Sequence, residues 1–239
     1  MFKNLMGFWK GKEFISQIFD EFNDMLNKCE FMFKTVTEHL LEKRENPDLK
    51  KIIYATDKEV NVQQRAIRKR IVEHLTLQPT VEFTVSLVMM SVVKDAERLG
   101  DYCKNVYEVT ELLNRPMNHD LYVEYFNGLD KEILTLFAQT KNAFLHADED
   151  QAKRAWEAEL SIGKGCDATI ERLAECDLSV NEAVCFTLLA RHYKRLIAHL
   201  VNIATAAILP LNKMDFFDEK RGRDDDEEAE WREAKSGKG

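Results

Sequence analysis

Two carboxylates four residues apart, Glu97 and Asp101, are the first side chains whose types and spacing could support chemistry. On an α-helix, residues at this spacing share a face with Cβ atoms about 5–6 Å apart, so the two acids repel each other unless water or a cation bridges them. Asn105 extends the same stripe by one turn. The pair alone is typical of an ordinary solvated acidic face, and a cation site on a helix surface is the alternative.

A second polar pair with the same spacing, Asp57 and Asn61, lies beside the apolar positions Ile53, Val60 and Ile67. If the two segments form neighbouring antiparallel helices, both pairs would face a common groove. Four oxygen donors there, completed by water, would suit Mg²⁺, Mn²⁺, Ca²⁺ or oxygen-bound iron. The alternative is that these residues are simply the polar side of an amphipathic helix.

Two further sets of side chains are weaker candidates. A basic cluster that could meet phosphate or an acidic partner, or be a solvated face, consists of Arg65, Arg68, Lys69 and Arg70. His192 and His199, seven residues apart, could be metal ligands or packed helix histidines. The sequence contains no H-E-x-x-H, E-x-x-H, G-x-S-x-G or Walker motif, and we therefore expect no enzyme.

The composition limits the class of protein that positions these residues. Among 239 residues, 45% are hydrophobic and only 9 are Gly and 4 Pro, too few turn residues for a β-sandwich or a Gly-rich nucleotide fold. A net charge of -8 argues against a nucleic-acid binder. No run approaches the roughly 20 apolar residues that cross a bilayer, and no signal peptide is visible. The five cysteines form no C-x-x-C pair, which favours reduced thiols in a cytoplasmic protein.

Apolar residues recur at steps of three and four along most of the chain, which is typical of a helical bundle. A strict series of this kind comprises Met89, Val92, Ala96, Leu99, Cys103, Val106, Thr110 and Leu113. Ser179 and Glu182 form a capping box, and Thr80 after Pro79 is a further helix start. We expect an all-α fold with six long helices: about 13–44, 48–77, 80–114, 118–146, 149–177 and 180–212.

An internal repeat with an offset of 97 residues relates the third and sixth predicted helices. The paired positions are Arg98 with Arg195, Leu99 with Leu196, Asn105 with Asn202 and Val106 with Ile203. We therefore expect two tandem three-helix bundles, at 13–116 and 117–213, that share a core. An arm (1–12) precedes them. A tail (214–239) follows, with 10 acidic and 6 basic residues, and we expect it to be disordered.

The run from Val93 to Asn105, with its Glu-Arg-Leu-Gly-Asp core, resembles the PhoU family of bacterial phosphate-uptake regulators. That family carries an E-R-x-G-D run followed by an Asn on the third helix of a three-helix unit that occurs twice. The segment from Thr56 to Asn61 looks like the family's second-helix motif, and Leu77 to Thr80 looks like its turn before the third helix. The resemblance covers about 13–212.

The resemblance implies two three-helix bundles and, in some members, a multinuclear iron or zinc cluster held by these acidic motifs. Carried over residue by residue, the expected ligands in the first repeat are Asp57, Asn61, Glu97 and Asp101. It also implies negative regulation of phosphate uptake through contact with a phosphate transporter and its sensor kinase. A homodimer is a further expectation, since long bundles often associate.

The second repeat departs from the motif. Where the family pattern has its two acids, this chain has Lys194 and Ala198. An ammonium group at that point would repel a metal cation, so we expect one metal face at most, and an inert or interaction face on the second repeat. Two other functions stay open at this point: a metal-storage or metal-sensing protein, and a helical scaffold with an unrelated partner.

Overall fold

The computed structural model describes residues 13–42, 46–78, 82–209, 211 and 214. Within these residues the chain is helical, with no strand, and forms seven helices: α2 (Glu13–Glu42), α3 (Leu49–Leu77), α4 (Phe83–Leu112), α5 (His119–Phe126), α6 (Leu129–His146), α7 (Glu149–Ala174) and α8 (Val180–Ala206). The all-α expectation is confirmed. The expected arm, the helix start at Thr80 and the tail apart from Met214 lie outside the described residues.

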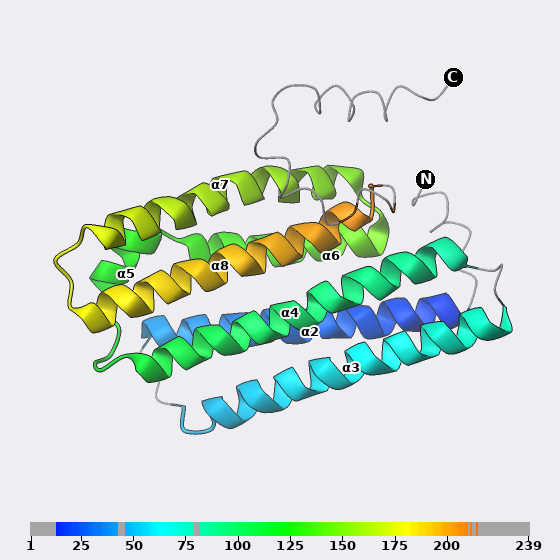
Figure 1. Cartoon of the computed structure of the whole chain (residues 1–239), viewed down its shortest axis with the longest axis horizontal. Coiled ribbons are helices and arrows are strands. Elements are labelled where there is room, and N and C mark those ends of the chain that lie inside the picture. Colours follow the sequence, from blue (N-terminus) through cyan, green and yellow to red (C-terminus); the bar gives the residue numbers. More distant parts are fainter. Residues whose placement is uncertain (1–12, 43–45, 79–81, 210, 212–213, 215–239) are drawn as a thin grey trace, which may run out of the picture.

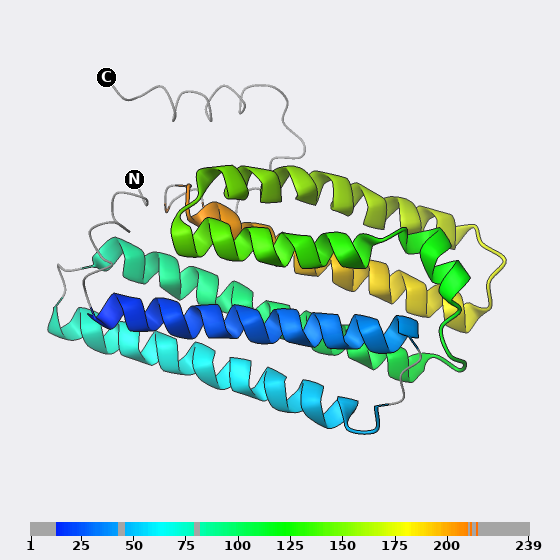
Figure 2. The ribbon, with the colours of Figure 1, turned by 180° about the vertical axis from the view of Figure 1, so that it is seen from behind.

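The helices form two tandem three-helix bundles. Helices α2, α3 and α4 pack on one another, as do α6, α7 and α8. The bundles meet where α4 packs along α8 and α2 along α6, so α3 and α7 lie at the outer edges (Figures 1 and 2). Helices α4 and α8 run antiparallel, because Asp95 contacts His199 whereas Leu112 accepts a hydrogen bond from Asn181. The exact boundaries 13–116 and 117–213 stay predictions.

One expected helix, 118–146, is two helices in the structure. Asn127 and Gly128 both adopt left-handed backbone conformations, with φ of 43° and 85°. Gly pays no steric penalty there and Asn pays less than most residues, so this pair ends α5 and redirects the chain into α6. Helix α5 begins with a side-chain cap, whereas α6 begins at Gly128 without one. The Asn118 side chain accepts hydrogen bonds from the amides of Asp120 and Leu121.

The predicted capping box at the start of α8 is present. The Ser179 hydroxyl accepts a hydrogen bond from the amide of Glu182 at 3.3 Å and donates to the Glu182 carboxylate at 2.5 Å. In the predicted seam of α4, six positions from Met89 to Val106 are fully buried, and the last two, Thr110 and Leu113, are half-buried. Alternating steps of three and four therefore placed the buried face of this helix correctly.

Aromatic side chains join the two bundles into one core. Phe33 on α2 packs against Phe137 on α6 and Tyr193 on α8, with ring centroids 6.0 and 5.6 Å away. Tyr193 is fully buried, and its hydroxyl lies 2.9 Å from that of Tyr122 on α5. These contacts cross between residues far apart in sequence, so removal of Phe33 weakens both bundles at once.

We predict that Phe33→Ala lowers the free energy of unfolding by about 3–5 kcal/mol, because it leaves a cavity where the two bundles meet. Urea denaturation followed by circular dichroism measures this change. Phe31→Ala, a neighbour on α2 that is 49% exposed, is the matched control and should shift stability by no more than about 0.5 kcal/mol. Equal losses in the two variants would contradict the shared core.

Candidate functional site

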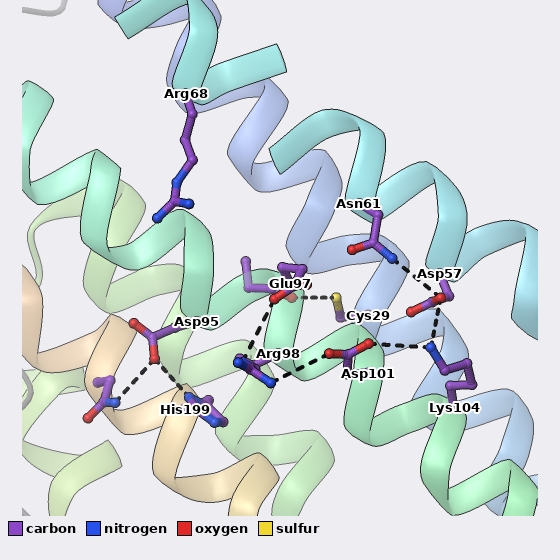
Figure 3. Close-up of polar contacts among 12 residues, drawn as sticks. Cys29, Asp57, Asn61, Arg68, Asp95, Glu97, Arg98, Asp101, Lys104 and His199 are labelled. Atoms are coloured by element: carbon purple, nitrogen blue, oxygen red, sulfur yellow. Dashed lines mark hydrogen bonds and ion pairs between the residues drawn. The ribbon is translucent and has the colours of Figure 1, made fainter. Parts of the chain in front are cut away.

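The two predicted polar pairs lie in one groove between α3 and α4 (Figure 3). Asp57 and Asn61 come from α3, and Glu97 and Asp101 come from α4. Gly100 of α4 faces this part of α3, and a Cβ atom at that position would make ordinary van der Waals contact with Val60 at 3.4 Å and with Oδ1 of Asp57 at 3.7 Å. Asp57 is almost buried, with 8% of its surface exposed.

Lys104, one turn beyond Asp101 on α4, holds two of these carboxylates together. Its Nζ atom lies 3.0 Å from Oδ2 of Asp57 and 3.3 Å from Oδ1 of Asp101. Partial burial acts to lower the pKa of Lys104, but the hydrogen bond and charge of Asp57, aided by Asp101, outweigh it and raise this pKa. The ammonium group therefore stays charged and supplies an internal counter-ion for the groove.

Arg98 lies on the other side of the acids. Its guanidinium is 3.9 Å from Oε2 of Glu97 and 3.8 Å from Oδ2 of Asp101. Burial first, and then the negative charge of Asp101, raises the pKa of Glu97 above its ordinary value. Asn61 donates to Asp57 through its amide nitrogen at 3.4 Å, so its donor side faces the carboxylate.

This arrangement does not fit a resident metal ion. A metal ion bridging Asp57 and Asp101 would have to displace the ammonium group of Lys104, which lies 3.0 and 3.3 Å from these carboxylates. If the ammonium group stayed, it and the metal ion would repel each other strongly in a partly buried groove. Across the described residues, no three His, Cys, Asp or Glu side chains gather closely enough to hold an ion. The metal-ligand role of Asp57, Asn61, Glu97 and Asp101 stays a prediction, and it requires Lys104 to move away.

The second bundle places an ion pair near the equivalent point. Lys194, which follows Glu97 by the repeat offset of 97, lies 2.6 and 2.7 Å from the two carboxylate oxygens of Asp167 on α7. A lysine paired with an aspartate on the neighbouring helix thus occurs in both bundles. Ala198, which replaces the second acid, is half-buried.

Sequence reasoning missed a polar contact between the bundles. Oδ1 of Asp95 on α4 lies 2.8 Å from Nδ1 of His199 and accepts a hydrogen bond from Asn202 at 3.2 Å (Figure 3). The internal repeat contained a signal for this contact, because Tyr102 corresponds to His199 by the offset of 97. These two rings stack between α4 and α8, with their centroids 5.6 Å apart. His192 lies 6.1 Å from the same tyrosine ring, and burial lowers its pKa.

Most of the predicted basic cluster on α3 is engaged within the molecule. Arg70 pairs with Glu21 and donates to Gln17 on α2, and Lys69 lies 3.7 Å from Glu73. Arg68 donates to the carbonyl oxygen of Met90 at 3.3 Å. Arg65 is exposed, and no carboxylate of the described chain lies within ion-pair distance of it. A partner-binding role for Arg65, Arg68, Lys69 and Arg70 stays a prediction.

Comparison with known proteins finds similarity to PhoU proteins in both sequence and fold. The family model described as "PhoU domain" matches residues 22–110. The structure of "the phosphate transport system regulatory protein PhoU from Streptococcus pneumoniae" superposes with a TM-score of 0.68 at 18% identity, over 82% of this chain and 95% of that one. PhoU from Pseudomonas aeruginosa gives 0.71 at 17%, with the same coverage. No curated protein matches the chain significantly.

Lys104→Met tests whether the lysine is the counter-ion of the groove. The variant leaves Asp57 without a cation and Asp101 with Arg98 alone, so we predict that it binds Mn²⁺ about tenfold more tightly than the wild type, or about 1.4 kcal/mol. Isothermal titration calorimetry measures both affinities. The control is Lys50→Met, which removes a lysine 3.2 Å from Glu111 at an exposed site and should change nothing. Equal affinities in all three proteins would refute the assignment.

Glu97→Gln tests the electrostatics of the same groove. The raised pKa means that Glu97 holds its proton more tightly when folded. This group therefore favours folding below its unfolded-state pKa, and the contribution is lost as the pH rises through the folded-state pKa. We predict that Glu97→Gln is more stable than wild type at about pH 7 and that the difference shrinks towards about pH 4.

Urea midpoints at the two pH values provide the measurement. Glu171→Gln, at an exposed position on α7, is the matched control and should show no such pH-dependent gain. A wild type that is the more stable protein at neutral pH would show that Glu97 is stabilised by its surroundings when charged.

Proposed function

This chain is a member of the PhoU family through the domain at residues 22–110, and from that premise we propose that it regulates phosphate transport by binding other proteins. The proposed regulation is negative: when phosphate is plentiful, this protein binds its partners and keeps phosphate uptake low. Its partners are components of a phosphate transporter and the associated sensor kinase. The proposal includes a homodimer and a cytoplasmic location.

The observation that carries the proposal is the agreement between the family match and the extent of the fold. The matched domain covers most of the first bundle, and the superposition with two PhoU structures includes both bundles. A partial resemblance would leave room for an added domain with another task. Here 95% of each related chain has a counterpart, which supports a regulator built on the complete fold.

The side-chain chemistry supports a binding role over catalysis. Burial raises the pKa of Cys29 and Cys103 far above the ordinary thiol value, and that of Cys166 to about 12. Thiols of this kind stay protonated and are poor nucleophiles. No described helix is both long and apolar enough to span a bilayer.

A metal-sensing function is the second candidate. Asp57 on α3 and Asp101 on α4 support it, because oxygen donors of both carboxylates lie within 3.3 Å of one point, the Nζ atom of Lys104. It would require both Lys104 and Arg98 to leave the carboxylates when the ion arrives. We therefore rank it below regulation by protein contact.

Deletion of the gene in its own host tests the proposal. We predict that phosphate uptake in phosphate-rich medium rises several-fold and that a plasmid copy restores repression. The tagged wild-type protein should also co-purify with transporter or sensor-kinase components. Unchanged uptake together with no co-purification would refute regulation by contact.

A double variant, Glu97→Gln with Asp101→Asn, separates the two candidate functions. It removes the carboxylates that a metal would need and leaves the outer surfaces of α3, α7 and α8 unchanged. Regulation by protein contact predicts that the variant restores repression as well as wild type does. Failure to restore, with normal stability and expression, would favour metal sensing.

A further inference from the structure

Helix α8 is basic in an otherwise acidic protein. It carries Arg191, Lys194 and Arg195, and its one acid is the capping residue Glu182. Lys194 is neutralised by Asp167, whereas Arg191 and Arg195 are exposed. No carboxylate within the described ranges forms an ion pair with either arginine.

The repeat places a matching pair of cations on α4. Lys94 and Arg98 correspond to Arg191 and Arg195 by the offset of 97, and both are exposed. The spacing of four on each helix puts each pair on one face. We call these four residues the basic seam: Lys94, Arg98, Arg191 and Arg195.

The contacts between α4 and α8 place Arg98 and Arg195 side by side, with Lys94 and Arg191 at opposite ends of the basic seam. Asp95 and Tyr102 on α4 both contact His199, and Tyr102 also lies 6.1 Å from the ring of His192. Arg98 lies between Asp95 and Tyr102 along α4, and Arg195 lies between His192 and His199 along the antiparallel α8. Helix geometry therefore brings Arg98 and Arg195 to the same level along the contact between α4 and α8.

Nearby acids offset only part of this charge. Asp95 is almost buried and occupied by His199 and Asn202. Asp101 shares its charge between Lys104 and Arg98, with the arginine at the longer distance of 3.8 Å, and Glu97 lies 3.9 Å from the same guanidinium. The side chain of Arg98 remains 45% exposed. The seam thus presents several positive charges over two helices, which is a larger footprint than a single small anion fills.

We propose that the basic seam is a docking surface for the chain's own acidic segment, Asp224–Glu228. These five consecutive carboxylates are the strongest concentration of negative charge in the sequence. A run of five acids matches cations spread over two helices, and charge complementarity of this kind guides association. The proposal does not depend on the regulatory function.

The length of chain permits this contact. Arg195 lies eleven residues before Ala206, the end of α8, which at about 1.5 Å per residue is roughly 17 Å along the helix. Met214 is buried against the core, and Asp224 follows it by ten residues. Ten extended residues span up to about 33 Å, so the acidic segment can reach the seam from that anchor point.

Zero-length carbodiimide cross-linking of the full chain tests the proposal, because it joins an amine to a carboxylate only when the two are in contact. Lys94 is the seam residue with an amine. We predict that mass spectrometry finds Lys94 linked to a carboxylate within residues 224–228. The yield should fall at least fivefold in Arg191→Glu with Arg195→Glu, and also in about 1 M salt, where the screening length is about 3 Å.

Arg154→Glu, at an exposed position on α7, is the matched control and should leave the yield unchanged. If the double reversal fails to fold, Arg195→Gln replaces it, with a smaller but measurable loss. An equal mixture of ¹⁴N- and ¹⁵N-labelled chains identifies the source of the segment. Links within one chain support the proposal. Links between chains, no link at Lys94, or a yield that ignores the arginines would overturn it.

Discussion

The packing of α4 along α8 is the contact on which the other features of this molecule depend. Each is the third helix of its bundle, and their inner faces bury Leu99 and Leu196 completely. Once these two helices lie antiparallel, the repeat offset of 97 dictates which residues meet on the outer side. That arrangement brings Asp95 to His199 and sets the arginines of the two repeats beside each other.

The same constraint shapes the groove between α3 and α4. Because α4 is held by α8 on one side, α3 packs on its remaining surface, where Gly100 of α4 faces Val60 and Asp57 of α3. Asp57 is then pushed into a partly buried position, where an uncompensated charge would be costly. Lys104 provides the compensation. The groove between α3 and α4 therefore encloses its own cation.

Much of the fold follows from local sequence, whereas the site depends on contacts across helices. Steps of three and four identified the buried face of α4, and Ser179 with Glu182 marked the start of α8. The break at Gly128 was missed because a single glycine inside a periodic segment does not by itself end a helix. The position of Lys104 was missed because its two partners include a residue 47 positions away on α3. No spacing rule along one helix contains that information.

Native-state hydrogen exchange in low denaturant is the most direct test of the claim that α4 and α8 make one cooperative body. If they do, the slowest amides of α4 and of α8 open with the same free energy and the same dependence on denaturant, equal to those of global unfolding. A clearly lower opening free energy and a smaller slope for one bundle would show that it unfolds while the other stays intact. That result would contradict the account.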